Sequence, residues 1–234
     1  MRSGAVEITV GKATARFTDR TGGLSRGRFE SLNLGSAQGD DPELVAGNRR
    51  LAVVGAGADA PVAMVQVHGT EIREVGARSG LDAGECDGIV TTERGLPLLA
   101  VTADCVPLVL VRGRRLAVVH AGWRGLAAGV VEAAADQLAQ AGNEPLEAAI
   151  GPSAGRCCYE VSPEVIESFG GDAVADGRML DLQATAAQIL GRLGAESPQV
   201  MSSCTICDPD SRFFSHRRDG APTGRQGVVA WLNS

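Results

Sequence analysis

Three apolar runs in the middle of the chain constrain the fold more than any other feature of the sequence. They span residues 96–102, 106–111 and 116–120, and a few polar residues separate each run from the next. A strand with one buried face alternates apolar and polar residues, whereas a continuous apolar run is typical of a strand buried on both faces. Such strands need a layer on either side. The sequence therefore predicts a layered mixed α/β (α+β) fold with a central mixed sheet flanked by helices.

Helical periodicity and capping residues predict the outer layers. An apolar stripe predicts a helix over residues 125–141, and Asp181 is predicted to cap another. Asp41 followed by Pro42 predicts the start of an earlier helix. With no repeat or linker in the sequence, residues 1–234 are predicted to form a single domain. Further strands are expected at residues 6–10, 13–17, 61–67, 71–75, 87–91, 146–150 and 228–232, with a hairpin joining 61–67 to 71–75.

Charge and hydropathy exclude several classes of partner. The chain has 22 Lys and Arg against 28 Asp and Glu, a net charge of −6. Neither nucleic acid nor an anionic membrane would attract such a protein, so neither partner is expected. No apolar run approaches the roughly 20 residues of a membrane-spanning helix. Residues 1–5 lead into an alternating segment and not into an apolar signal core, so we expect a cytoplasmic protein, either a monomer or a small homo-oligomer.

Two histidines and one cysteine stand at the ends of predicted strands. His68 follows the run that ends at residue 67, Cys105 lies between two apolar runs, and His120 ends the third. Two imidazoles and a thiolate are a suitable ligand set for Zn²⁺, and three protein ligands leave a fourth position for water or substrate. Copper also binds nitrogen and sulfur ligands. We predict a catalytic metal site at these residues, with Zn²⁺ as the expected ion and Cu²⁺ as the alternative.

Polar residues near these ligands are candidates for the chemistry. Asp104 precedes Cys105, and in an extended segment its side chain would point to the opposite face, as a proton carrier or as a turn residue. Arg124 lies at a predicted helix start, where backbone N–H groups attract anions. Asn48 and Arg49 lie on the first predicted helix, where they would contact substrate or form a solvated face.

The remaining cysteines are harder to interpret. Cys204 and Cys207 have CxxC spacing. A structural zinc would need two further ligands, for which Cys157-Cys158 or His216 are the candidates. A redox role would place the pair at a helix start in a βαβ setting. The favoured interpretation of these thiols from sequence alone is that they are inert.

At these residues the chain resembles the YfiH/YlmD family, also called the laccase-domain or DUF152 family. The similarity extends over nearly the whole chain, in order. One departure is His216, where many members have tyrosine. The matching segments are 66–69, 102–105, 120–125, 150–152 and 214–219, together with 17–20, 31–35 and 48–49 near the N-terminus.

This resemblance implies a YfiH-like fold related to putative cysteine hydrolases, with zinc bound by His68, Cys105 and His120. It also implies an enzyme acting on purine nucleosides. The expected reactions are phosphorolysis of adenosine, inosine, guanosine and methylthioadenosine, and hydrolytic deamination of adenosine. The partners would then be a purine nucleoside and phosphate, and Arg49, Arg124 or Arg217 would bind the phosphate.

Other functions remain open. The family is also named for polyphenol oxidase or copper laccase activity, but a multicopper cluster needs many histidines, and this chain has 3, without a His-x-His pair. Oxidase activity at a single copper is therefore a secondary expectation. A metal-free alternative uses Cys105 as nucleophile and His120 as base to cleave an amide, for example in peptidoglycan precursors. The fourth hypothesis is a non-enzymatic protein that binds a metal and serves as a scaffold for a partner.

Overall fold

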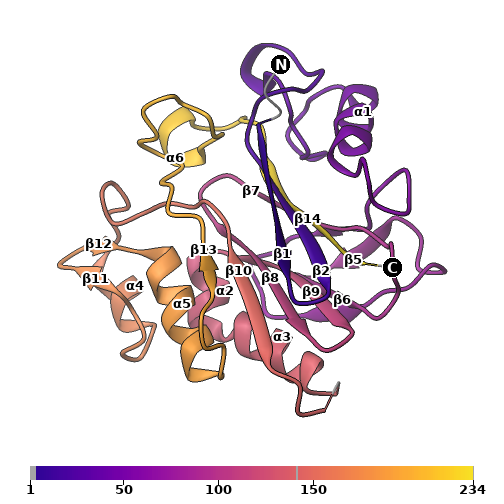
Figure 1. The fold of residues 1–234 in the computed structure, drawn as a ribbon. Helices are drawn as coiled ribbons and strands as arrows, with labels where there is room; N and C mark the ends of the chain where they lie inside the picture. Colours follow the sequence, from indigo (N-terminus) through magenta and orange to yellow (C-terminus); the bar gives the residue numbers. More distant parts are fainter. Residues whose placement is uncertain (1–3, 141, 234) are drawn as a thin grey trace.

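The computed structural model describes residues 4–140 and 142–233, in which two large sheets pack face to face (Figure 1). The first sheet is four-stranded, and all of its neighbouring strands are antiparallel. Its strands form near the two ends of the chain and in the middle, so distant parts of the sequence meet in it. Their order is β1 (Ala5–Val10), β2 (Ala13–Thr18), β14 (Gln226–Leu232) and β7 (Leu98–Thr102).

The second sheet is six-stranded and mixed. Two of its neighbouring pairs, one at each edge, are parallel, and the central pairs are antiparallel. The predicted mixed α/β class is confirmed, and the structure adds that the strands divide between two sheets. The order is β13 (Gln199–Val200), β10 (Leu146–Ile150), β8 (Val106–Arg112), β9 (Arg115–Ala121), β6 (Gly88–Thr91) and β4 (Ile72–Glu74).

Two of the apolar runs, 106–111 and 116–120, are buried on both faces because they form β8 and β9 of the six-stranded sheet, which has a core on each side. Along β8, Leu108 and Leu110 belong to the core beneath the helices, whereas Val109 and Val111 belong to the core between the two sheets. All four side chains are fully or almost fully buried. The alternation is therefore between two apolar environments, and no polar residue marks the period of the strand.

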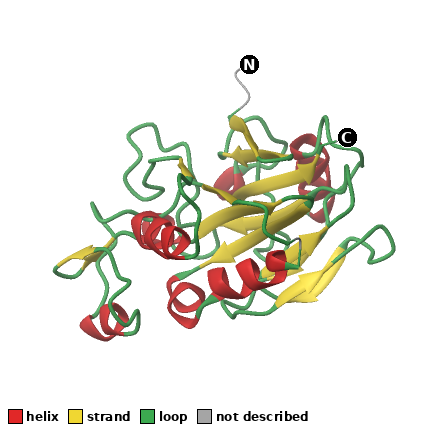
Figure 2. Ribbon diagram, turned by 60° about the horizontal axis from the view of Figure 1, so that its bottom comes forward, coloured by secondary structure: helices red, strands yellow, loops and turns green. Residues whose placement is uncertain are grey.

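Helices cover the outer faces of both sheets. On the six-stranded sheet lie α3 (Val130–Ala139) and α5 (Leu182–Arg192), and Figure 2 shows red helices against the yellow strands. Near the outer face of the four-stranded sheet lies α1 (Pro42–Ala52), whose end packs on β7 and β14. The predicted caps are confirmed: Asp41 accepts a hydrogen bond from the N–H of Glu43, and Asp181 from the N–H of Ala184. The helix boundaries thus follow local chemistry.

One predicted helix is two. The sequence stripe predicts a single helix over residues 125–141, but α2 (Trp123–Ala128) ends at Gly129 and α3 begins after it. Gly129 has a φ of 95°, a left-handed conformation that glycine adopts without a steric penalty and that ends a helix. The predicted last residue, Ala141, lies outside the described residues. The break changes the direction of the chain between the start of α2, beside His120, and the long α3.

The predicted hairpin between residues 61–67 and 71–75 is wrong. Instead, β3 (Ala63–Val65) pairs in parallel with β5 (Asp82–Glu85), and β4 pairs in parallel with β6. The backbone N–H groups of the loop between β3 and β4 donate hydrogen bonds to the buried carboxylate of Asp87. These bonds replace the cross-strand hydrogen bonds of a hairpin.

The other elements are short. They are a 3-10 helix at Gly27–Phe29, α4 (Pro163–Glu167), β11 (Ala175–Asp176), β12 (Met179–Leu180) and α6 (His216–Asp219). Within the described ranges, no helix is long and apolar enough to cross a membrane. The expectation drawn from the start of the chain rests on residues 1–5, of which residues 1–3 lie outside the described part.

Candidate metal centre

The structure brings His68, Cys105 and His120 to one point. Each offers a ligand atom, and the three atoms lie within 4.8 Å of one another. His68 Nε2 lies 3.8 Å from Cys105 Sγ, and the two imidazole rings meet edge to face with their centroids 4.9 Å apart. His120 is 3% exposed, whereas His68 is exposed and Cys105 is half-buried. One side of this cluster is therefore open to solvent.

Sheet topology explains why these residues meet. Strands β8 and β9 are antiparallel neighbours, so the start of β8, just after Cys105, lies beside the end of β9, which contains His120. Cys105 itself belongs to the turn between β7 and β8, where the chain passes from the four-stranded sheet to the six-stranded sheet. The cluster thus lies where the two sheets are joined.

Asp87 organises the cluster, although it was not among the residues predicted for the site. Its carboxylate, fully buried, accepts hydrogen bonds from the backbone N–H groups of Val67, His68 and Gly69 at 2.6–3.2 Å. It also accepts one from Nδ1 of His120 at 2.8 Å. The three N–H groups form a concave anion-binding nest, with His68 in a left-handed conformation (φ 63°). One carboxylate therefore fixes both histidines.

The signal for Asp87 was present in the sequence. A charged residue directly before the buried 88–91 strand must find partners, because an unpaired buried carboxylate is very costly. Which groups would be its partners depends on the tertiary structure.

Electrostatics favour a thiolate at Cys105. Burial alone would raise the pKa of its thiol, but His120 and His68 outweigh burial and lower that pKa to about 6. Burial opposes the charged form of His120, but the Cys105 thiolate and Asp87 raise the pKa of His120 to about 9. For Asp87, burial is outweighed by hydrogen bonds from His120 and the backbone, which lower its pKa below the usual value. Without a metal, these shifts favour a thiolate at Cys105 beside a protonated imidazole at His120.

The donor set fits Zn²⁺ well. It consists of two imidazoles and one thiolate, with a carboxylate behind one imidazole that fixes its tautomer. Because Asp87 binds Nδ1 of His120, the other ring nitrogen, Nε2, is the one available to an ion. Three ligands on an open-sided cluster leave a position for water or substrate. An open position of this kind distinguishes catalytic metal sites in general from closed structural ones.

Alkylation measures the lowered thiol pKa. In chelator-treated protein, we expect the iodoacetamide reaction at Cys105 to rise with pH around a midpoint of about 6, because the thiolate is the reactive form. An ordinary thiol has its midpoint near pH ~8.5. Peptide mass mapping assigns the modified site. A midpoint above 8 for the Cys105 peptide would contradict a thiolate favoured by His120.

Gly122 forms one wall of the cluster. A Cβ at this position would lie 2.8 Å from Cδ2 of His68 and 3.0 Å from Sγ of Cys105. Its backbone (φ −75°, ψ 167°) is allowed for any residue, so the substitution acts through space and not through backbone strain.

We expect Gly122→Ala to lower zinc affinity at least about 10-fold, as other changes that misplace a ligand do, with little loss of fold stability. Competition with a chromophoric chelator gives the affinity, and thermal unfolding gives the stability. Gly191→Ala is the matched control, because nothing lies within 4 Å of the Cβ it would add in α5. Equal zinc affinity for both variants would mean that the wall does not constrain the ligands.

The sequence suggested an extended segment at Asp104, but the structure has a bend there instead. Its φ is 94°, and the turn directs its buried carboxylate away from solvent. The carboxylate accepts hydrogen bonds from the hydroxyl of Thr205 at 2.6 Å and from the backbone N–H of Arg217 at 2.7 Å. Three distant segments of the chain are thereby joined next to Cys105. The expectation of an extended conformation is wrong because the chain must change sheets at this point.

Two predicted arginines belong to segments that contact the cluster: Arg124 follows Gly122 by two residues, and the backbone N–H of Arg217 donates to Asp104. The guanidinium of Arg217 stacks on the ring of Tyr159, with Cζ 4.9 Å from the ring centroid, and Arg124 stacks on Trp123 at 4.2 Å. Burial raises the pKa of Tyr159 to about 12, as does the Cys105 thiolate, while both arginines oppose that rise. Tyr159 therefore stays protonated at neutral pH. Both arginines are exposed and available to an anion.

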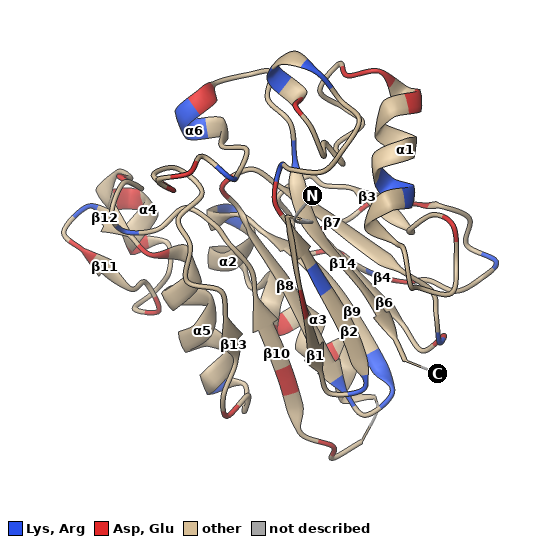
Figure 3. Ribbon diagram, turned by 45° about the horizontal axis from the view of Figure 1, so that its top comes forward, with Lys and Arg blue, Asp and Glu red and all other residues tan. Residues whose placement is uncertain are grey.

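Arg225 was missed from the sequence. It precedes Gln226, which pairs with Thr102 at the end of β7, shortly before Cys105, and burial lowers the pKa of its guanidinium. Its side chain donates to the backbone carbonyls of Thr223 and Gly224. Figure 3 shows that α6, which carries Arg217 and Arg218 beside Asp219, adds further charge to this part of the molecule. No pattern in the sequence marks Arg225.

Asn48 lies in a buried network and not on a solvated face. Its amide nitrogen donates to Ser25 Oγ and to the carbonyls of Ser31 and Asn33, and its oxygen accepts from the N–H of Leu24. These bonds hold the loop before α1. A role in substrate binding for Asn48 stays a prediction.

Arg49, next to Asn48, is also partly buried, and burial lowers the pKa of its guanidinium. Its Nε donates to the carbonyl of Leu34 at 2.9 Å, and Nη2 lies 3.5 Å from Ser36 Oγ. Its role in binding phosphate likewise stays a prediction.

Solved structures of similar chains share this fold. A DUF152 protein from Neisseria meningitidis has a TM-score of 0.85 at 31% identity, covering 99% of this chain and 100% of the other. YfiH from Bacillus licheniformis has a TM-score of 0.84 at 30% identity, covering 94% and 93%. YlmD from Geobacillus stearothermophilus has a TM-score of 0.82 at 29% identity, covering 96% and 93%.

Similar sequences carry an enzyme name. A Streptomyces coelicolor protein named purine nucleoside phosphorylase is 41% identical, over 96% of this chain and 98% of its own length. A Mycobacterium tuberculosis protein of the same name is 38% identical, over 98% and 95%. The family described as "Multi-copper polyphenol oxidoreductase laccase" matches residues 14–233. With nearly the whole chain matched in sequence and in fold, this protein belongs to that laccase-domain family, also known as DUF152 or YfiH.

Proposed function

We propose that this protein is a zinc-dependent purine nucleoside enzyme. Its main reaction would be phosphorolysis of adenosine, inosine, guanosine and methylthioadenosine, with hydrolytic deamination of adenosine at the same site. The observation that carries the proposal is the open-sided His68–Cys105–His120 cluster with exposed arginines beside it. The relatives named purine nucleoside phosphorylase support the choice of substrate.

The chain's own residues would bind and orient the reactants. Zn²⁺, when bound by the three ligands, supplies a Lewis acid that polarises an oxygen atom at its open position. Arg124 and Arg217 would hold the phosphate, since planar guanidinium groups match its oxygens. Asp87 would keep His120 in the tautomer that binds through Nε2. The protonated phenol of Tyr159 would donate a hydrogen bond to substrate.

In phosphorolysis, an oxygen of the bound phosphate attacks C1′ of the ribose. The C1′–N9 bond breaks, the purine leaves with its electron pair and takes up a proton, and ribose 1-phosphate forms. Deamination of adenosine instead adds water at C6 and releases ammonia. The two reactions therefore differ in their dependence on phosphate.

A single assay with two co-substrate conditions tests the proposal. Protein purified without added metal is analysed for its elements and incubated with adenosine, with and without phosphate, and the products are separated. We expect adenine and ribose 1-phosphate only when phosphate is present, and inosine in both conditions. Zinc-loaded protein that forms none of these products would refute the proposal.

A second candidate function is supported by the geometry of the metal-free site. Cys105, His120 and Asp87 have the nucleophile–base–orienting acid arrangement of a cysteine hydrolase, with the Cys105 pKa lowered to about 6. Such an enzyme would cleave an amide, for example in a peptidoglycan precursor. Zinc and nucleophilic attack compete for the same sulfur. Chelation should therefore abolish nucleoside turnover, while a cysteine hydrolase would keep or gain activity.

Copper chemistry stays a secondary proposal. Copper binds nitrogen and sulfur donors more tightly than zinc does, so copper-loaded protein would have it at His68, Cys105 and His120. The 3 histidines of the chain are too few for a trinuclear cluster within one chain. We therefore propose that any oxidation of polyphenols depends on copper loading and is lost when zinc replaces copper.

A further inference from the structure

Four cysteines outside the metal centre form a second cluster. Cys157, Cys158, Cys204 and Cys207 each offer a sulfur, and the four sulfurs lie within 4.8 Å of one another. The Cys157–Cys207 sulfur distance is 3.2 Å, the Cys157–Cys158 distance 3.4 Å and the Cys158–Cys204 distance 3.5 Å. A tetrahedral ion with Zn–S bonds of about 2.3 Å needs sulfurs roughly 3.8 Å apart. The cluster already has nearly this size.

One backbone N–H group already donates to a sulfur of the cluster. The N–H of Gly155 donates to Sγ of Cys204 at 3.4 Å. Cys204 and Cys207 sit at the ends of a CxxC turn, the spacing by which one loop supplies two ligands to zinc. Backbone donors of this kind stabilise negative sulfur.

We propose that Cys157, Cys158, Cys204 and Cys207 bind one Zn²⁺ as a closed structural site, separate from the His68–Cys105–His120 centre. Each cysteine binds as a thiolate, and its proton is released to solvent, so uptake of the ion is coupled to pH. All four tetrahedral positions are occupied by protein. The ion therefore has no place for substrate, and its effect is on the structure.

The position of the cluster shows what the ion would hold together. Cys157 and Cys158 lie in the loop after β10, and Cys204 and Cys207 in the loop after β13. Between Cys204 and Cys207 lies Thr205, whose hydroxyl donates to Asp104, the neighbour of Cys105. A metal at the four sulfurs would thus fix the loop that supports the turn of the catalytic cysteine.

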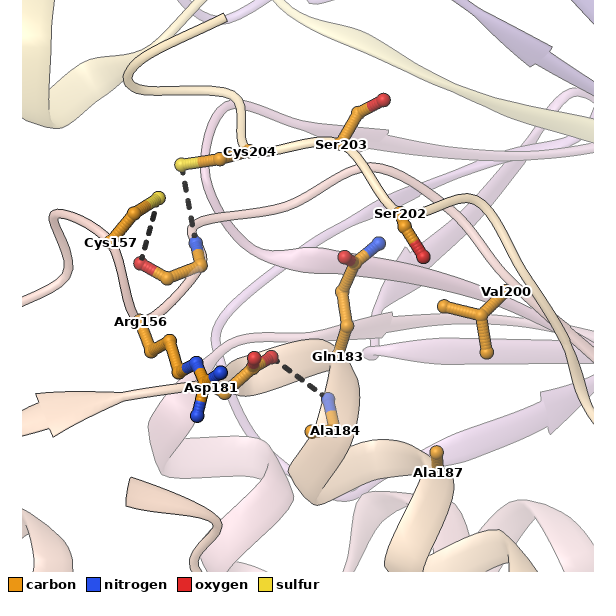
Figure 4. Close-up of a pocket in the computed structure, with 11 residues that line it drawn as sticks. Arg156, Cys157, Asp181, Gln183, Ala184, Ala187, Val200, Ser202, Ser203 and Cys204 are labelled. Atoms are coloured by element: carbon orange, nitrogen blue, oxygen red, sulfur yellow. Dashed lines mark hydrogen bonds between the residues drawn. The ribbon is translucent and has the colours of Figure 1, made fainter. Parts of the chain in front are cut away.

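A cleft gives the ion a way in. It has a volume of about 450 Å³, and its lining includes Cys157 and Cys204, together with Asp181 and Gln183 at the start of α5 (Figure 4). The sulfurs of Cys157 and Cys204 both contact the backbone of Gly155, at 3.8 and 3.4 Å. Cys157 and Cys207 are exposed, and the other two are half-buried. Chelators and metal ions therefore reach the cluster without unfolding the protein.

Metal stoichiometry tests the proposal. Protein purified under reducing conditions is expected to contain two zinc ions per chain by elemental analysis. We expect one in Cys207→Ser and in Cys157→Ser, one in Cys105→Ala, and none in the Cys105→Ala/Cys207→Ser double variant. Cys86→Ala, which alters a buried thiol outside both clusters, should keep two. If Cys207→Ser and Cys157→Ser retain the wild-type zinc content, the proposal is refuted.

Two further measurements use protein in which all four cysteines of the cluster are intact. A folding defect caused by replacing one of these four cysteines therefore cannot affect the result. Cobalt-loaded Cys105→Ala should show the intense charge-transfer and d–d absorption of a tetrathiolate site. The 6 thiols of the wild-type chain should all react after denaturation with chelator and without reductant. Two disulfides within the cluster would leave two reactive thiols and no tetrathiolate spectrum, which would overturn the proposal.

Limited proteolysis tests whether the ion stabilises the loop that contains Cys157. Arg156 is exposed next to Cys157, so trypsin should cleave there at least about 10-fold faster after chelation, because a locally opened loop is the substrate of the protease. Cys105→Ala protein, which lacks the other centre, should show the same acceleration. Unchanged cleavage on zinc removal would contradict a structural ion at this place.

Discussion

Cys105→Ala is expected to lose the catalytic metal and to reduce nucleoside turnover (kcat/KM) by at least about three orders of magnitude. The sulfur is one of three ligands, and alanine cannot replace it. The side chain is half-buried and lies in a turn, outside the apolar cores, so the fold should survive. Elemental analysis, steady-state kinetics and thermal unfolding measure the three effects separately.

The matched control is Cys86→Ala, the same chemical change at a buried thiol in the core between the sheets. It should keep the metal and the turnover while losing some stability to the cavity it leaves. Full nucleoside turnover by Cys105→Ala would remove the centre from the mechanism.

Asp87→Asn is expected to weaken zinc binding by about 10- to 100-fold, although Asp87 is not a ligand. An asparagine presents an NH₂ group to donors that need an acceptor, either the N–H groups of the 67–69 loop or Nδ1 of His120. At least one buried donor is left unsatisfied, at a cost in folding free energy of about 1–3 kcal/mol. The change thus disturbs both histidines at once. Chelator competition measures the change in zinc affinity, and denaturant unfolding measures the change in folding free energy.

The pH dependence separates this electrostatic effect from simple packing. The folded-state pKa of Asp87 is lowered, so its charge stabilises the fold above the ordinary carboxyl pKa, and that contribution is lost as pH falls through the folded value. The difference in the free energy of unfolding between wild type and Asp87→Asn should therefore be largest at neutral pH and should decrease as the pH becomes acidic.

Asp181→Asn is the control, since asparagine caps a helix as well as aspartate. If the difference in unfolding free energy between wild type and Asp87→Asn does not change with pH, the effect of the substitution comes from packing and not from the charge of Asp87.

The predictable part of the centre came from residue chemistry. His68, Cys105 and His120 stand out because imidazole and thiolate are metal ligands and each follows or ends an apolar run. Asp87 supports two of them, but its partners come from a loop and a strand far away in the sequence, and no local pattern indicates them. The four-cysteine cluster is a similar case. Its two pairs are visible in the sequence, but their meeting depends on the packing of two loops.

The sequence by itself determined the strands that are buried on both faces and the helix caps at Asp41 and Asp181. It also determined that the candidate metal ligands are nitrogen and sulfur donors. These are properties of short segments, set by side-chain hydrophobicity and local hydrogen bonding. Only the tertiary structure decided that the strands divide into two sheets, that Gly129 interrupts a helix and that Asp87 joins His68 to His120. Those outcomes depend on which distant groups become neighbours, and long-range pairing is governed by the free energy of the whole packed core.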